Sequence, residues 1–353
     1  MLRIIVLILA ILPALLLANQ QERISRIIAF GDSLSDAGNK HLITLQMNQA
    51  AKGVIGVRGM PPNVSARFSN GFSWVDQLNI SLWRQPSTPA MAGIDSILEI
   101  NNGTEHFSFP LSIQPLKGNN WAVGGAMTGS GYFVDIDLKD GATLTSGGTI
   151  MPNIGQQIND FAAQHGRFLS SDLVILQGGA NNLWFTLFGD LNDTGHRAAL
   201  KLIQQISQLK GLGAKHILVM NLPSFQYGAV LNPYAEKTKV FIEEFNKTLS
   251  DKLAQLDIQQ YEQPTIYLFD VHKLFTKVID RIESTGQFKH EKTNTLIKHV
   301  LEPAWNWSNN KIADDPNEYL FWDGLHPSAS THRLLAYKAK KLLLKNGVYF
   351  RHN

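Results

Sequence analysis

Four short apolar runs follow one another along the chain and predict the strands of one sheet. Their apolar residues are nearly continuous rather than alternating, which is typical of parallel strands covered on both faces. A weaker run at residues 119–123 is a candidate for one more strand. The four strong runs are residues 26–30, 173–176, 216–220 and 266–269.

Helical periodicities lie between and after these runs, with apolar residues three or four positions apart. Gly211 and Gly213 are expected to end the second helix, because glycine is favoured just beyond a helix C-terminus. Strand and helix in alternation predict an α/β fold, a three-layer α/β/α sandwich with a mostly parallel central sheet. The helical patterns cover residues 154–162, 200–209, 241–253 and 336–344.

No repeat or low-complexity linker divides the chain, so we expect a single domain over residues 19–353. Long loops are expected at residues 40–66, 80–117, 130–150 and 275–320.

The first 18 residues stand apart, with Arg3 as their only charge, an apolar stretch, and the small residue Ala18 before a polar run. This layout is that of a secretory signal peptide. An uncleaved membrane anchor is the alternative, but the stretch is short for a full span. The sequence therefore predicts cleavage after Ala18 and a secreted or periplasmic protein.

Composition narrows the classes of function. Of 353 residues, 44% are hydrophobic and 17% charged, which is enough for a large core and unlike a disordered chain. The formal net charge of +3 is small for this length, so nucleic acid is not an expected partner, although a mildly basic surface suits peripheral contact with anionic membranes. The absence of cysteine excludes a cysteine nucleophile and thiolate metal sites.

A serine follows the first predicted strand in a short polar segment. Ser33 lies three residues beyond that strand, within the sequence Phe-Gly-Asp-Ser-Leu-Ser-Asp-Ala-Gly-Asn at residues 30–39. Sites in open α/β sheets form beyond the carboxyl ends of the strands, which makes this hydroxyl a candidate nucleophile. The structural alternative is a helix N-cap formed by Ser33, Ser35 or Asp36.

A candidate base lies near the other end of the chain. A serine hydroxyl needs a base within hydrogen-bond reach, and histidine is the natural one at neutral pH. In Asp323-Gly-Leu-His326-Pro, a carboxylate three residues earlier in a tight turn can accept from the imidazole Nδ1–H and leave Nε2 free to take the serine proton. The alternative is an ordinary turn histidine, one of 11 in the chain.

Two further segments are rich in glycine and asparagine, at residues 118–126 and 178–182. Glycine can turn its N–H toward a ligand, and an asparagine amide can donate a second hydrogen bond, as an oxyanion hole requires. Both residue types also favour ordinary turns. The order of the four segments is more specific than any of them alone, because it resembles the GDSL family of lipases and esterases, the SGNH hydrolases. Residues 67–74 also resemble the family segment that follows its first block.

The resemblance implies a flavodoxin-like fold and a role for each matching residue, with no metal and no cofactor. It departs from the family at Asn182, where the third block usually ends in aspartate. The implied roles are Ser33 as nucleophile and backbone oxyanion donor, Gly125 as a second backbone donor with Gly124 as its near alternative, Asn181 as a side-chain donor, His326 as general base and then acid, and Asp323 as its orienting carboxylate.

The expected activity is hydrolysis of carboxylic esters through an acyl-enzyme on Ser33. The form of the blocks resembles secreted bacterial phospholipases A, lysophospholipases A and glycerophospholipid–cholesterol acyltransferases, so a lipid ester is the expected substrate and acyl transfer an additional activity. The aromatic residues within 183–188 can line an acyl channel or serve as ordinary core. A second aromatic group can line the channel or anchor a loop: Trp305, Trp307, Phe321 and Trp322. The alternatives are a short-chain or carbohydrate acetylesterase, and a catalytically inactive lipid- or glycan-binding protein. No obligate protein partner is implied.

Overall fold

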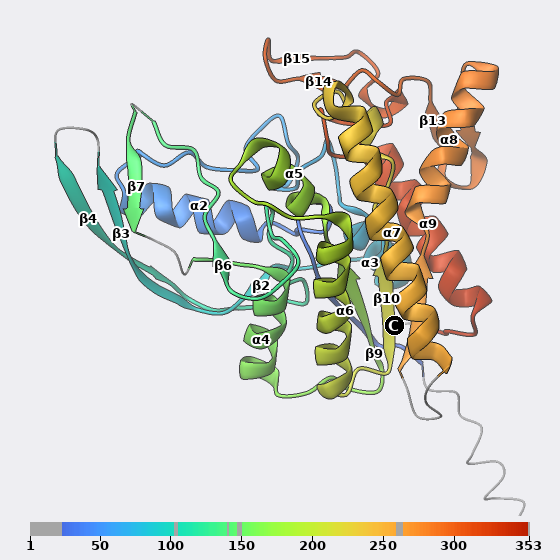
Figure 1. The fold of residues 1–353 in the computed structure, drawn as a ribbon, viewed down its shortest axis with the longest axis horizontal. Helices are drawn as coiled ribbons and strands as arrows, with labels where there is room; N and C mark the ends of the chain where they lie inside the picture. Colours follow the sequence, from blue (N-terminus) through green and yellow to red (C-terminus); the bar gives the residue numbers. More distant parts are fainter. Residues whose placement is uncertain (1–22, 102–104, 140, 147–149, 259–263, 352–353) are drawn as a thin grey trace, which may run out of the picture.

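A parallel four-stranded sheet forms the centre of the protein. The computed structural model describes residues 23–101, 105–139, 141–146, 150–258 and 264–351, so the predicted signal peptide lies outside the described residues. The strand order is β1-β9-β10-β11, and every pair is parallel (Figure 1). All four predicted strands are confirmed: β1 (Arg26–Phe30), β9 (Asp172–Gln177), β10 (His216–Met220) and β11 (Thr265–Phe269).

The weaker run at residues 119–123 runs along the free edge of β1 without becoming a strand. Ala29 donates its N–H to the Asn119 carbonyl at 3.0 Å and accepts from the Trp121 N–H at 2.8 Å. One more hydrogen bond runs from the Val123 N–H to the Gly31 carbonyl at 3.0 Å, but the Gly31 N–H donates to Gln157 Oε1 instead of continuing the ladder. With this segment counted, the order along the sheet becomes 2-1-3-4-5, that of a flavodoxin-like fold.

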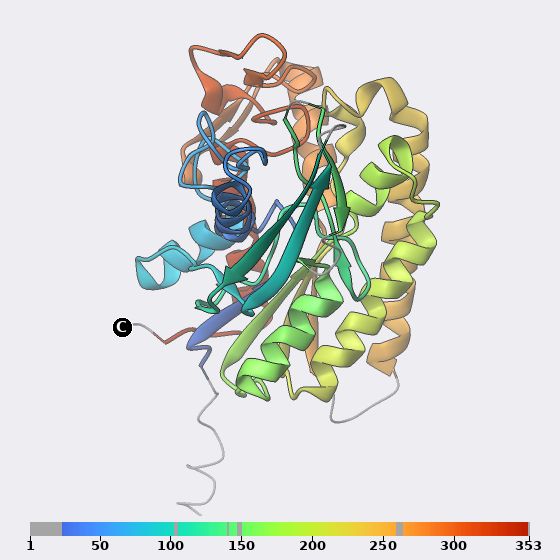
Figure 2. The same cartoon turned by 90° about the vertical axis from the view of Figure 1, so that its left-hand side faces the viewer.

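Helices cover both faces of the sheet and complete the three predicted layers. The helices α4 (Ile154–His165), α6 (Gly195–Gly211) and α7 (Ala235–Ile258) cover one face. The helices α3 (Trp74–Trp83) and α9 (Ala329–Lys345) pack together on the other face, as Figure 2 shows. The helix α8 (Val271–Thr285) follows β11 directly, and α5 (Ala180–Phe188) follows β9. Strands that are buried on both sides explain the continuous apolar runs of the sequence.

Two helix predictions need correction. The buried face of α6 contains Ala198, Leu202 and Ile206, whereas the predicted members Leu200 and Ile203 are only half-buried. Small residues form this face because α6 approaches α7 closely: a Cβ on Gly195 would lie 2.0 Å from a backbone carbonyl of α7. The last helix begins at residue 329 rather than 336, because Ser328 caps it by accepting the N–H of residue 331.

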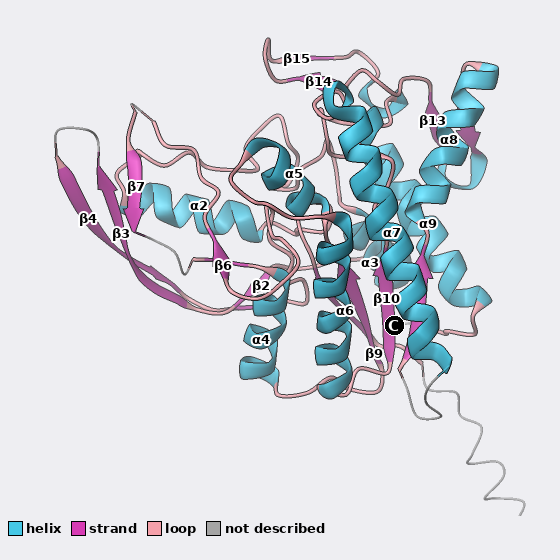
Figure 3. Cartoon of the chain, in the orientation of Figure 1, coloured by secondary structure: helices cyan, strands magenta, loops and turns pink. Residues whose placement is uncertain are grey.

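The regions predicted as long loops contain regular elements (Figure 3). The helix α2 (Asn39–Ala50) was missed because its buried positions include the polar Asn39, Lys40 and Thr44, which leave no clear apolar stripe. The hairpin of β3 (Ile94–Asn101) and β4 (His106–Ile113) projects from the body as an antiparallel arm, with β7 (Thr143–Ser146) on its other edge. Short two-stranded pairs account for the rest: β2 (Ala90–Met91) with β5 (Leu116–Lys117), β6 (Tyr132–Phe133) with β8 (Met151–Pro152), β12 (Phe288–His290) with β13 (Thr295–Ile297), and β14 (Trp305–Asn306) with β15 (Lys311–Ile312).

Within the described ranges, no helix combines the length and the apolar character that crossing a bilayer requires.

Candidate active site

A buried aspartate shapes the turn that carries Ser33. The side chain of Asp32 is fully buried, its Oδ1 accepts the Leu34 N–H at 3.0 Å, and its carbonyl accepts the N–H groups of Ser35 and Asp36. This turn directly follows β1 and leaves the Ser33 hydroxyl facing a cavity. Ser33 does not cap a helix, because α2 begins at Asn39 and the carboxylate of Asp36 accepts its first N–H groups.

The structure brings together the three residues of the predicted triad, although 293 positions separate the serine from the histidine. His326 Nε2 lies 2.8 Å from the Ser33 hydroxyl, and His326 Nδ1 lies 2.8 Å from Asp323 Oδ2. Asp323 Oδ1 accepts the backbone N–H groups of Leu325 and His326 at 2.8 and 2.7 Å, which fixes the orientation of the carboxylate. This is the arrangement in which an imidazole can take a proton from a serine.

Burial and charge tune the titration of these groups. The pKa of His326 is raised above its ordinary value, because the attraction of Asp323 outweighs the opposing effect of burial. The pKa of Asp323 is lowered, because His326 and the backbone donors outweigh burial. Burial raises the pKa of Asp32 to about 6. Burial also lowers the pKa of His332 to about 3, which keeps it neutral as it accepts the Trp74 N–H.

Residues of the segment 67–74 brace the turn that carries His326. The ring of Phe68 stacks on the imidazole, with centroids 5.3 Å apart and an interplanar angle of 27°. The Ser69 hydroxyl donates to the Pro327 carbonyl at 2.9 Å, and Asn70 Oδ1 accepts the N–H of residue 329 at 2.7 Å. The sequence marked this segment only by family resemblance and gave no sign that Phe68 would contact the base.

The two adjacent glycines of the second block, Gly124 and Gly125, differ in the hydrogen bonding of their N–H groups. The N–H of Gly124 donates to Asp36 Oδ2 at 2.8 Å and is therefore occupied, which disfavours it as the alternative oxyanion donor. Gly125 has a φ of +90°, and its N–H has no hydrogen-bond acceptor among the described residues. A Cβ at Gly125 would lie 2.8 Å from the Phe133 ring, so the site admits only glycine without rearrangement.

The third block enters the same cavity from the start of α5. Asn181 Nδ2 donates one hydrogen to the Ala126 carbonyl at 3.0 Å and retains a second hydrogen for a ligand. Its neighbour Asn182, the departure from the family pattern, lies behind the site. Its Oδ1 accepts the Thr128 N–H at 2.9 Å and its Nδ2 donates to Asp193 Oδ2 at 2.9 Å. An amide suits this position because it both accepts and donates, whereas a carboxylate would face another carboxylate.

A cavity of about 330 Å³ opens above the serine. Its wall is aromatic on one side, where Trp184 and Phe185 of α5 lie near Trp305 and Trp307 of the β14–β15 hairpin. Phe321 and Trp322 take the structural alternative rather than a place in the channel, because both are buried to 1% exposure and Trp322 stacks on Trp305 of that hairpin.

Charged residues also line the cavity. Arg58 pairs with Asp137 at 2.9 Å and with Asp135 at 3.5 Å, and the buried Lys40 pairs with Asp135 at 3.0 Å. Across the described residues, no group of three or more His, Asp or Glu side chains is arranged to ligate a metal ion. The site therefore offers a serine hydroxyl, a base within hydrogen-bond reach, unoccupied N–H donors and a cavity lined by both aromatic and charged residues.

Comparison with known proteins agrees with the resemblance read from the four blocks. The family model for GDSL-like lipase/acylhydrolase matches residues 27–339. The chain is 25% identical to the anther-specific proline-rich protein APG of Brassica napus, over 94% of this chain and 74% of that protein. It is 24% identical to the thermolabile hemolysin of Vibrio parahaemolyticus, over 91% and 64%, and 23% identical to the phosphatidylcholine-sterol acyltransferase of Aeromonas hydrophila, over 90% of both. The chain belongs to the GDSL-like lipase/acylhydrolase family and is a carboxylic ester hydrolase.

Proposed function

We propose that this protein hydrolyses lipid esters through an acyl-enzyme on Ser33. The observation that carries the proposal is the continuous hydrogen-bonded path from Ser33 through His326 to Asp323, with both links at 2.8 Å, at the floor of a cavity with an aromatic wall. The alternative of a catalytically inactive binding protein would need no such path.

The first half of the reaction forms the acyl-enzyme. Ser33 Oγ bonds to the ester carbonyl carbon while its proton passes to His326 Nε2. The carbonyl oxygen becomes negative and accepts from the N–H groups of Ser33 and Gly125 and from the side-chain amide of Asn181. The bond to the alcohol oxygen then breaks, and His326 returns the proton to the leaving alcohol.

The second half releases the acid. Water replaces the alcohol, gives a proton to His326 and bonds to the acyl carbon, and Ser33 leaves with that proton returned to its oxygen. An alcohol in place of water would yield an ester, which is acyl transfer. The similarity to a phosphatidylcholine-sterol acyltransferase makes transfer to a sterol a product worth measuring.

The cavity wall supports an amphiphilic substrate. Trp184, Phe185 and Trp305 offer a surface for an acyl chain, while Arg58 and Asp135, which line the same cavity, can bind polar parts of a head group. The volume of about 330 Å³ is at the small end of ligand pockets, which run from roughly 300 to 1,000 Å³, and favours one acyl chain at a time. A lysophospholipid or one chain of a phospholipid meets these conditions.

Ser33→Ala tests the chemistry. We expect hydrolysis of a nitrophenyl ester to fall by at least about 10⁴-fold, because the covalent route is lost. Surface Ser207→Ala is the matched control and should retain activity. A fluorophosphonate probe should label Ser33 in the wild type, as located by peptide mass mapping. Wild-type rates from the Ser33→Ala variant would refute the mechanism.

A second experiment tests the substrate class. Rates on nitrophenyl acetate, butyrate, octanoate and palmitate are compared, followed by product analysis with lysophospholipid, phospholipid and phospholipid plus cholesterol. We expect medium and long chains and the phospholipid esters to be cleaved. Activity confined to acetate would overturn the lipid assignment and favour an acetylesterase.

We also propose that residues 1–18 direct export and are removed. Mass spectrometry of the mature N-terminus of the protein expressed with its full sequence tests this, with a start at Asn19 expected. An N-terminus that retains Met1 or Leu2 would refute the proposal.

A further inference from the structure

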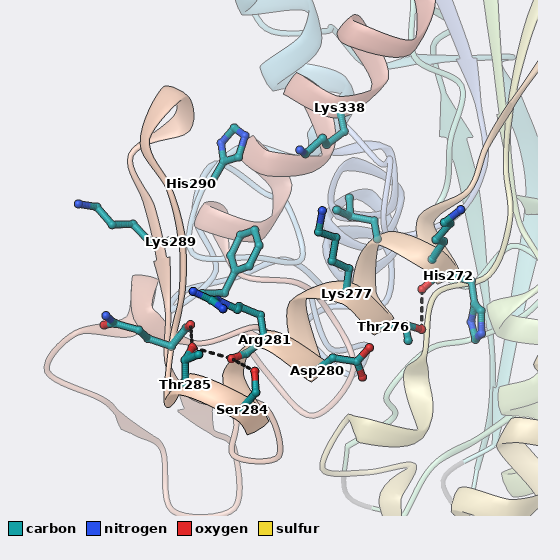
Figure 4. A pocket seen from close by; sticks show the side chains of 14 residues that line it. His272, Thr276, Lys277, Asp280, Arg281, Ser284, Thr285, Lys289, His290 and Lys338 are labelled. Atoms are coloured by element: carbon teal, nitrogen blue, oxygen red, sulfur yellow. Dashed lines mark hydrogen bonds between the residues drawn. The ribbon is translucent and has the colours of Figure 1, made fainter.

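A wide basic groove lies between α8, the β12 strand and α9, apart from the catalytic cavity. Its volume is about 1,100 Å³, and Figure 4 shows Lys277 and Arg281 reaching into it from α8 and Lys338 from α9. Its charged lining residues are Lys273, Lys277, Arg281, Lys289 and Lys338, with Asp280 as the acidic member and His272 and His290 beside them.

The positive charge of this groove is concentrated and uncompensated. Five Lys and Arg residues against one Asp give a formal +4, whereas the whole chain carries +3. Among the described residues, Lys273, Lys277, Arg281 and Lys338 have no carboxylate within ion-pair distance, and Lys289 has only Glu291 at 3.8 Å. The adjoining helix α9 has no acidic residue over its 17 positions. Outside the groove the positive and negative charges of the chain therefore nearly cancel, whereas the groove carries an excess of positive charge.

Neighbouring cations in the groove oppose one another. Burial lowers the pKa of Lys338, and Lys341 and Lys277 lower it further. Burial likewise lowers the pKa of His290, with Lys338 as the next cause. A bound anion would relieve this repulsion.

The groove lies toward the same end of the molecule as the rim of the catalytic cavity. Figures 1 and 2 both place α8 and the β14–β15 hairpin beyond the carboxyl ends of the central strands. The hairpin exposes Trp307 and Ile312, at 56% and 47% of their surface, and Trp307 also lines the catalytic cavity. Basic residues and exposed apolar side chains at one end of a molecule are typical of a surface that adheres to anionic membranes.

We propose that this groove docks the protein onto a membrane surface that contains anionic phospholipid. The cations are spread along two helices and a strand instead of converging on one point, which suits several head groups better than one small soluble anion. The proposal rests on the proposed lipid-ester function, because docking would bring the catalytic cavity to its substrate. It adds a second site whose role is binding alone.

The test separates docking from catalysis by using Ser33→Ala protein, which leaves the vesicles intact. Sedimentation with vesicles of phosphatidylcholine is compared with vesicles that contain about one third phosphatidylglycerol. We expect binding to the anionic vesicles that weakens strongly between about 0.1 and 1 M salt, because the screening length falls from roughly 10 to 3 Å. Binding should be weak on phosphatidylcholine alone.

Two variants with equal loss of charge locate the docking site. Each removed cation should lower partitioning about fivefold, so the groove variant should bind at least a hundredfold more weakly than the control. Both should hydrolyse a soluble nitrophenyl ester at wild-type rates when Ser33 is retained. The groove variant carries Lys273→Gln, Lys277→Gln, Arg281→Gln and Lys338→Gln; the control carries the exposed changes Lys52→Gln, Lys117→Gln, Lys215→Gln and Lys237→Gln.

Equal binding by both variants would overturn the proposal, as would binding that does not distinguish anionic from zwitterionic vesicles. Saturation of the groove by inorganic phosphate without any binding to vesicles would also overturn it and would assign the groove to a soluble anion. Loss of the lipid-ester function would appear separately, as failure to cleave phospholipid in detergent micelles, where docking is not needed.

Discussion

Replacing Asp323 by asparagine tests how the catalytic histidine is oriented. Asp323 Oδ1 is held by two backbone N–H donors, those of Leu325 and His326, so an asparagine should keep its carbonyl oxygen at that position. Its NH₂ group would then replace Oδ2, 2.8 Å from His326 Nδ1. An NH₂ group donates, so Nδ1 would have to accept, and the ring proton would move to Nε2.

This change of tautomer affects the Ser33 hydroxyl. A protonated Nε2 points at the Ser33 hydroxyl 2.8 Å away and cannot remove its proton. Inversion of the tautomer in a serine triad costs about 10⁴-fold in kcat, which corresponds to about 5 kcal/mol of barrier. The overall fold should persist, because both backbone hydrogen bonds of the turn remain.

The same substitution changes the pH dependence with a defined sign. The base acts when unprotonated, so activity rises with pH through the pKa of His326, which lies above its ordinary value because of Asp323. Without that carboxylate, burial dominates and lowers the pKa of His326, so the residual acid limb should move to lower pH.

The assay is kcat/KM for a nitrophenyl ester between about pH 5 and 9, with the thermal midpoint measured alongside. Asp323→Glu is the matched control, because it retains the charge but displaces the carboxylate, and it should keep the acid limb above the ordinary histidine pKa. A loss of less than about tenfold in Asp323→Asn, or an acid limb that stays in place, would refute the assigned role of Asp323.

Three other substitutions test separate parts of the structure. Gly125→Ala should lower kcat about 100-fold with little change in KM, because its Cβ would meet Phe133 and displace the N–H donor. A rise in KM as large as the fall in kcat would contradict this. Asn182→Asp should lower the free energy of unfolding by about 2–4 kcal/mol at pH 7, because the new carboxylate would face that of Asp193, and by less near pH 4.5, where carboxyl groups begin to take up protons. Urea denaturation at the two pH values measures this difference. His332 has a folded pKa of about 3, below that of an unfolded histidine, so its contribution to stability is complete above about pH 6.5 and is lost on acidification at up to about 1.4 kcal/mol per pH unit. In His332→Gln, the urea midpoint should therefore change less between pH 7 and 5 than it does in the wild type. An equal change of the urea midpoint with pH in both proteins would count against this role of His332.

The central sheet could be predicted from the sequence because its strands are short, buried on both faces and uniformly apolar. The four blocks of the site could be found for a related reason. Each follows a strand or forms a tight turn, so its position in the fold depends on local chemistry and on the general rule that strand ends meet at one edge of the sheet. Ser33 and Asn181 illustrate this, since each lies a few residues beyond its strand.

The elements that were missed depend on contacts that one segment does not encode. The helix α2 buries Asn39 and Lys40, whose partners come from residues 120–135, so its polar sequence favoured a loop. Phe68 lies against His326 only because the hydrogen bonds of Ser69 and Asn70 tie two distant segments together. The basic groove likewise combines α8, β12 and α9; the basic residues of α9 alone do not predict a groove, because most of its lining comes from the other two elements.

The buried carboxylate of Asp36 belongs to a block that the sequence identified, yet its contacts reach a distant segment that the sequence did not connect to it. The resemblance to the family matches Asp36 to the first block, where we expect it to shape the loop rather than to react. In the structure its two oxygens accept the first N–H groups of α2 and, across 88 positions, the N–H of Gly124. By accepting the Gly124 N–H, the carboxylate leaves Gly125 as the glycine of this pair whose N–H has no acceptor among the described residues. Asp36 therefore holds the serine turn, the start of α2 and the loop of the two glycines in one geometry, which gives an acidic residue three positions after Ser33 a positioning role in the proposed reaction.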